Sequence, residues 1–126
     1  MTDDDLLQRL KWSISALAQP AEVQKKLFPP FVCVSDELAL EFDEFHQQLR
    51  RRRTLPPASR ELLLQIDEAL EQMSGVHQQE MWTDQALQTA AEWERVRALA
   101  RELITQMNWS PKPPPLERNL YVGPDA

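Results

Sequence analysis

The sequence is poor in the residues that make tight turns and cross-links. Its 126 residues include 2 Gly, 1 Cys and 2 His, against 10 Pro. Two-residue β-hairpin turns rely on Gly or on Asn-Gly pairs, and no Asn-Gly pair occurs, so the sequence disfavours a hairpin-rich β fold. The single cysteine, Cys33, excludes a disulfide within the chain and suits a reducing compartment.

Long apolar runs and an excess of positive charge are also absent. No stretch approaches the roughly 18 apolar residues that a membrane span needs. The chain opens with three aspartates after Met-Thr, where a secretory signal would be basic. The formal net charge is -6, so the long-range field repels phosphate. These features predict a soluble, cytoplasmic protein that binds neither membranes nor nucleic acid.

Apolar residues recur every three or four positions along most of the chain, which is the spacing of one face of an α-helix. Thr2 with Asp5 forms a capping-box pattern at the first helix, and Thr83 is the expected cap of the last. Prolines break residues 28–34 into an extended connector that should bury Phe28 and Phe31. The predicted helices cover about residues 3–18, 21–27, 35–53, 58–74 and 84–107.

This pattern predicts an all-α fold. We expect residues 1–108 to form a single-domain antiparallel bundle of four main helices plus one short helix. The proline-rich tail, residues 109–126, should be extended and packed on the bundle. A helical homodimer is an alternative, because one narrow apolar stripe has coiled-coil spacing and could meet its own copy. That stripe consists of Leu38, Phe42, Phe45 and Leu49.

Four consecutive arginines, Arg50, Arg51, Arg52 and Arg53, stand out in this acidic chain. Successive helical residues point in different directions, so the run makes no flat basic face for a phosphate backbone. At a helix end, the cations interact favourably with the helix dipole. None has an acidic residue four positions earlier, so each charge meets solvent, another element such as Glu61, or an acidic partner.

Three large apolar residues lie off the main helical stripes. They are Trp12, Leu40 and Leu64. Exposed tryptophan is enriched in binding hot spots, so the three could belong to a partner surface. We favour the alternative that the C-terminal tail folds back and covers them, because the apolar residues of the tail have no other place to be buried.

The sequence offers little for catalysis. It contains no Gly-rich phosphate loop, no Gly-x-Ser-x-Gly turn and no His-Glu-x-x-His motif. Asp43 and His46 lie three apart, as do His77 and Glu80, but neither pair matches the Glu-x-x-His pairs of two-metal helical bundles. A metal-binding bundle enzyme that uses His46, His77 and nearby carboxylates remains an alternative.

Together these observations predict a small, acidic, non-catalytic helical protein that needs no cofactor and acts by binding another protein. Adaptor, inhibitor and immunity-type roles all fit, in a monomer or a homodimer. An acidic surface would steer a basic partner toward it. The candidate partner surface consists of Trp12, Leu40, Leu64 and the arginines Arg50, Arg51, Arg52 and Arg53.

Overall fold

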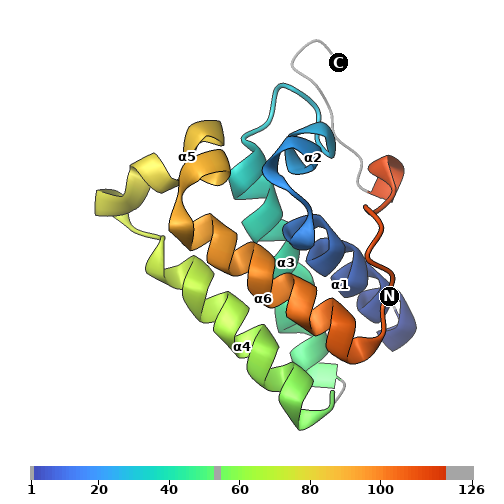
Figure 1. Ribbon diagram of the computed structural model, residues 1–126. Coiled ribbons are helices and arrows are strands. Elements are labelled where there is room, and N and C mark those ends of the chain that lie inside the picture. The colour runs from blue at the N-terminus through green and yellow to red at the C-terminus, as the bar shows by residue number, and fades with distance from the viewer. Residues whose placement is uncertain (1, 53–54, 119–126) are drawn as a thin grey trace.

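The computed structural model describes residues 2–52 and 55–118, and within those ranges it contains helices and no strands (Figure 1). The predicted all-α class is therefore confirmed. None of the helices in these ranges is long and apolar enough to cross a membrane. The α-helices are α1 (Asp3–Ala18), α2 (Ala21–Lys26), α3 (Val34–Arg52), α4 (Pro57–Gln72), α5 (Asp84–Thr89) and α6 (Ala91–Met107). Two short 3-10 helices are η1 (Val76–Met81) and η2 (Leu116–Arg118).

The four long helices form the bundle. Helix α1 packs against both α3 and α6, and α6 packs against both α1 and α4. In Figure 1, α6 crosses the front of the bundle with α4 on one side and α1 on the other. Helices α3 and α4, by contrast, meet over only a limited area. The bundle is therefore tightly packed along three of its seams and open along the fourth, between α3 and α4.

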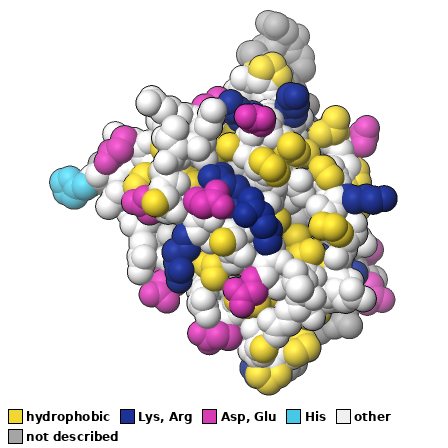
Figure 2. Space-filling model, viewed as in Figure 1, with side chains coloured by type: hydrophobic (Ala, Val, Ile, Leu, Met, Phe, Trp, Pro, Cys, Tyr) yellow, Lys and Arg dark blue, Asp and Glu magenta, His cyan; other side chains and the backbone are white. Residues whose placement is uncertain are grey.

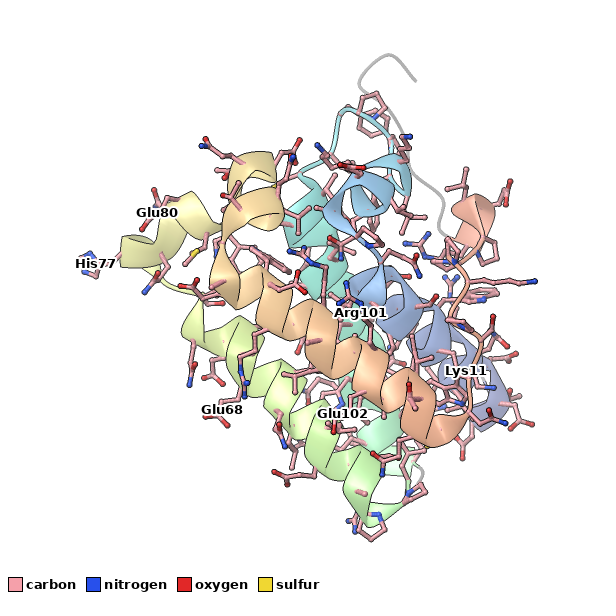
Figure 3. All side chains as sticks on the ribbon, in the orientation of Figure 1. Lys11, Glu68, His77, Glu80, Arg101 and Glu102 are labelled. Carbon is pink, nitrogen blue, oxygen red and sulfur yellow. The ribbon has the colours of Figure 1, made fainter. Side chains whose placement is uncertain are left out.

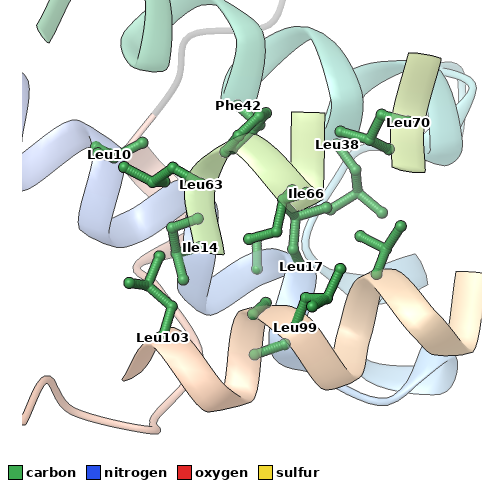
Figure 4. Packing of buried hydrophobic residues seen from close by; sticks show 14 of the residues in the cluster. Leu10, Ile14, Leu17, Leu38, Phe42, Leu63, Ile66, Leu70, Leu99 and Leu103 are labelled. Atoms are coloured by element: carbon green, nitrogen blue, oxygen red, sulfur yellow. The ribbon is translucent and has the colours of Figure 1, made fainter. Parts of the chain in front are cut away.

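The predicted apolar stripes form the core, where leucine, isoleucine and phenylalanine side chains of all four long helices interlock (Figure 4). The stripe of α3 is buried inside this core, at most 3% exposed. It consists of Leu38, Phe42, Phe45 and Leu49. A second copy of the chain could not reach this stripe without opening the bundle, because the chain's own helices already cover it.

The predicted caps form as expected at two helix starts. Thr2 Oγ1 accepts a hydrogen bond from the Asp5 amide at 3.1 Å, and the Thr2 amide donates to Asp5 Oδ2 at 3.1 Å. Thr83 Oγ1 accepts from the Ala86 amide at 3.1 Å.

The connector between α2 and α3 differs from the prediction. Residues 28–34 contain turns and bends, and Phe31 is 45% exposed while Phe28 is buried. The expectation that Phe31 is buried in the core was wrong.

A buried network of side-chain hydrogen bonds connects the short helices α2 and α5 to the long helices α1 and α6. The Gln24 side chain of α2 donates from Nε2 to the carbonyl oxygens of Ala16 and Leu17, at 3.1 and 3.0 Å. Arg97 of α6 donates from Nη1 to Gln24 Oε1 at 3.3 Å and to the Leu87 carbonyl of α5 at 2.9 Å. Carbonyls at the end of a helix have no partner within the helix, so these side chains satisfy groups that burial would otherwise leave unbonded.

The predicted last helix is broken in two, and its expected continuity over residues 84–107 was wrong. Ala90 is extended (φ -77°, ψ 136°) and lies between α5 and α6. In an unbroken helix, the Leu87 carbonyl would accept from the amide of Ala91. The break leaves that carbonyl for the buried Arg97 guanidinium. Leu87 and Trp93, on either side of the break, are both fully buried.

The described part of the proline-rich tail lies against α1. The Ser15 hydroxyl donates to the Lys112 carbonyl, and Gln19 Nε2 donates to the Pro111 carbonyl at 3.1 Å. Farther along, Arg9 Nη1 donates to the Arg118 carbonyl. These bonds run from side chains to backbone, so the tail needs no regular secondary structure to dock.

A buried ion pair joins Arg118, in the described part of the tail, to Glu41 of α3. Arg118 Nε lies 2.9 Å from Glu41 Oε2, and Nη2 lies 3.0 Å from Oε1, so the pair is bidentate. Both side chains are at most 5% exposed. The Arg118 guanidinium also lies over the Phe28 ring, 5.0 Å from its centroid. Breaking a buried pair from one side is costly, because the other charge keeps its desolvation penalty.

We expect Arg118→Met to lower the free energy of unfolding by about 3–5 kcal/mol, because it removes both bidentate bonds from buried Glu41. Urea denaturation measures the loss. The matched control is Arg95→Met, at an exposed position of α6, which should change stability by less than about 0.5 kcal/mol. Equal unfolding midpoints for the two variants would show that the pair does not stabilise the fold.

Candidate partner-binding groove

The open seam between α3 and α4 forms a groove of two successive pockets. The first, here the acidic pocket, has a volume of about 680 Å³ and lies beside the first half of α3 and the second half of α4. The second, here the arginine pocket, has a volume of about 510 Å³ and lies beside the end of α3 and the start of α4. The acidic pocket is lined by Asp36, Ala39, Leu40, Phe42, Asp43, Gln47, Asp67, Leu70, Glu71, Ser74, Gly75 and Trp82. The arginine pocket is lined by Leu10, His46, Leu49, Arg50, Leu55, Pro57, Arg60, Glu61, Leu63 and Leu64.

Helical spacing explains the lining of the acidic pocket. On α3, Asp36, Leu40, Asp43 and Gln47 follow one another at steps of four, three and four, so they share a face. By helical spacing this face lies roughly opposite the buried stripe of α3, and Ala39 and Phe42 extend the lining from it toward the core. The pocket thus combines a polar rim with an apolar floor, to which buried Phe42 contributes.

Carboxylates dominate the rim of the acidic pocket. Four of them line it, and Asp43 Oδ1 accepts a weak hydrogen bond from Gln47 Nε2 at 3.4 Å. Within the part of the chain that the structure describes, Asp36, Asp67 and Glu71 form no ion pair. Their negative charges therefore lie together at the pocket, without a neutralising cation among the described residues.

The charged residues of the arginine pocket are mostly positive: Arg50 and Arg60 line it with a single carboxylate, Glu61. Leucines of α1, α3 and α4 form its walls, and Leu64 is 47% exposed at its edge. Arg50 and Glu61 line this pocket without pairing with each other, and Arg60 has no ion-pair partner among the residues that the structure describes. The expectation that Glu61 might neutralise an arginine of the run is not met at Arg50.

The structure brings together only part of the surface predicted from the sequence. Leu40, 61% exposed, lies on the acidic pocket, whereas Leu64 and Arg50 lie on the arginine pocket. Arg51 and Arg52 are exposed at the end of α3 but line neither pocket. Arg53 lies outside the described residues.

Trp12 belongs to a different surface. It is half-buried on α1 and lines a hollow with Trp109 and the tail prolines 113–115. The Arg9 guanidinium lies 5.7 Å from the centroid of the Trp12 ring, and Lys11 Nζ lies 5.6 Å from that of Trp109. No residue lines both this hollow and the groove. Trp12 is therefore a neighbour of the docked tail and not part of the α3–α4 groove.

The two histidines occupy contrasting places. His46 is 3% exposed, stacks on the Phe42 ring with centroids 5.0 Å apart, and its Nε2 atom has no hydrogen-bond partner in the described structure. His77 projects with Glu80 from η1 at the edge of the molecule (Figure 3), where it is the single histidine seen in Figure 2. Over residues 2–52 and 55–118, no group of three His, Cys, Asp or Glu side chains could hold a metal ion.

The burial of His46 was missed in the sequence, although a signal was present. The residue lies four positions after Phe42, next to the apolar stripe of α3, so helical geometry places it at the edge of the core. The pattern alone left open whether the stripe was narrow or wide enough to include position 46.

Burial lowers the pKa of His46 below its usual range. The negative charge of Asp67 acts against this shift, Arg50 adds to it, and Asp43 opposes it. His46 is therefore held in its neutral form, in which one ring nitrogen is a donor and the other an acceptor.

We expect the free energy of unfolding to fall as the pH drops below about 6.5, because unfolded His46 binds a proton there and folded His46 does so only at lower pH. His46→Phe should flatten this part of the profile, measured by denaturation between about pH 7 and pH 5. The control, His77→Gln, removes the exposed histidine and should keep the wild-type slope. A full slope in His46→Phe would show that other groups cause it.

Comparisons with known protein families, with curated proteins and with solved structures give no match for this chain.

Proposed function

We propose that the protein acts without catalysis, by binding a basic amphipathic helix of another protein in the α3–α4 groove. The acidic pocket is the observation that carries this proposal. It presents four carboxylates around an apolar floor on a face that no other described element covers. An adaptor, an inhibitor or an immunity protein would each use such a surface.

The negative charge of the acidic pocket favours a basic partner. Asp36, Asp67 and Glu71 form no ion pair with any described residue, and the whole chain carries a net charge of -6. Their field would steer a cationic segment into the pocket and would raise the rate of encounter at low salt. Charges on the rim of an interface contribute more to this rate and to specificity than to affinity.

The apolar part of the groove would supply the affinity. Leu40 is 61% exposed at the rim, and burying such a side chain contributes about 1–2 kcal/mol. An amphipathic helix places apolar residues at i, i+3, i+4 and i+7 on one face, which suits a long groove between two helices. The two pockets provide successive positions for these residues along α3.

Affinity capture from cells, followed by titration of the purified partner, tests the proposal. We expect Leu40→Lys to weaken binding about tenfold or more, because it removes apolar area and adds a positive charge that repels a basic helix at the rim. The double change Asp43→Lys and Glu71→Lys should slow association most strongly at low salt and also weaken binding, since it reverses two charges in the acidic pocket.

Matched changes outside the groove separate a specific surface from a general effect. Leu116→Lys alters another leucine, 59% exposed, and Glu102→Lys reverses a charge on the exposed side of α6 (Figure 3). Neither residue lines the groove. Both variants should bind as the wild type does. A captured protein that binds the groove variants and the control variants equally well would refute the proposed site.

A further inference from the structure

The two ends of the α3–α4 groove carry opposite charge. The acidic pocket is lined by four carboxylates and, among the described residues, by no lysine or arginine. The described lining of the arginine pocket has two cations, Arg50 and Arg60, and one anion, Glu61, so its formal charge is +1. The groove is therefore not a uniformly acidic surface, although the chain as a whole has a net charge of -6.

Each helix that borders the groove has this charge order by itself. On α3, Asp36 and Asp43 line the acidic pocket, and Arg50 lines the arginine pocket. On α4, Arg60 lines the arginine pocket, and Glu71 lines the acidic pocket. The two helices run in opposite directions along the groove, because the end of α3 and the start of α4 meet at the arginine pocket. Opposite orders in sequence thus produce the same order of charge in space.

The two charged ends lie far enough apart for a partner to meet them separately. Along α3, Asp36 and Arg50 are fourteen positions apart, which at about 1.5 Å per residue is about 21 Å. Along α4, Arg60 and Glu71 are eleven positions apart, which is about 16 Å. Interactions between exposed charges are largely screened beyond about 8 Å at physiological ionic strength. Cations of a partner held at the acidic pocket would therefore not cancel the repulsion between further cations and the two arginines.

Two exposed leucines set the register of the partner. Leu40 lies on the acidic pocket, and Leu64 lines the arginine pocket together with His46. His46 follows Leu40 by six positions on α3, which is about 9 Å along the groove. Apolar residues at positions i and i+7 of a helix are about 10 Å apart on one face, so one partner helix can cover both leucines.

We propose that the partner helix is charge-segregated, with lysines or arginines over the acidic pocket and an aspartate or glutamate over the arginine pocket. This inference rests on the helix-binding function proposed above and specifies its partner. The charge order of the partner then sets its direction. A helix with its cations in the N-terminal half lies parallel to α3, and one with its cations in the C-terminal half lies antiparallel to α3.

Three synthetic amphipathic peptides of about 20 residues, long enough to form a helix across the groove, test the proposal against the purified full chain. All share the same leucine face. The first has lysines in its N-terminal half and glutamates in its C-terminal half, the second has the reversed sequence, and the third has lysines in both halves. We expect both segregated peptides to bind at least about fivefold more tightly than the third at physiological ionic strength, measured by fluorescence anisotropy.

Charge reversal in the arginine pocket should invert this preference. The double change Arg50→Glu and Arg60→Glu replaces two exposed cations and should make the uniformly basic peptide the tightest binder of the three. The control is the double change Arg51→Glu and Arg95→Glu. It alters the net charge equally at exposed positions that line neither pocket of the groove, and Arg51 shares the last turn of α3 with Arg50. It should keep the wild-type preference, and the same order of affinities in both double variants would overturn the inference.

A nitroxide label at the N-terminus of each segregated peptide reports the direction of binding. We expect the label of the first peptide to broaden the NMR signals of Leu40 more than those of Leu64, and the label of the reversed peptide to do the opposite. Broadening of the same leucine in both complexes, or equal affinity of all three peptides, would overturn this inference and leave helix binding in the groove intact. If none of the peptides binds, the inference and the proposed function are both wrong.

Discussion

The buried hydrogen bonds of Gln24 and Arg97 are the constraint on which the arrangement of this fold depends. Gln24 satisfies carbonyls at the end of α1, and Arg97 joins Gln24 to the Leu87 carbonyl of α5. Both side chains are almost fully buried. A network of this kind holds only when every member has its partner, because the low dielectric of the interior makes an unpaired group costly. It therefore fixes where α2 and α5 sit against the long helices.

A second set of polar contacts determines which surface remains open. The tail docks on α1 through bonds from Ser15 and Gln19, and Arg118 ends this segment in the buried pair with Glu41 of α3. Trp12 consequently lies beside the tail. No segment between residues 2 and 52 or 55 and 118 covers the seam between α3 and α4 in this way, and the exposed Leu40 and Leu64 lie there with carboxylates that form no ion pair with a described residue.

Much of the candidate site could be anticipated residue by residue, but not as a site. Position off the helical stripe placed Leu40 and Leu64 on the outer sides of their helices, but the structure shows both exposed, and the described part of the tail does not cover them as expected. The same rule applied equally to Trp12, which the tail approaches. Periodicity says which side of its own helix a residue occupies, and it does not say which other segment lies opposite. Leu40 of α3 and Asp67 of α4 line one pocket only because the two helices lie side by side in the fold, which periodicity along the chain does not reveal.

The sequence by itself determined the helical class, the apolar stripes and the caps at Thr2 and Thr83, because spacing and capping act within a few residues of one chain segment. Only the tertiary structure decided the break at Ala90, the pairing of Glu41 with Arg118 and the burial of His46. Each of these depends on groups far apart in sequence. No proline or glycine marks the break at Ala90, and the Leu87 carbonyl that the break frees accepts a hydrogen bond from Arg97. Helix propensity depends on residues close together in sequence, whereas buried polar groups find their partners on segments that are distant in sequence.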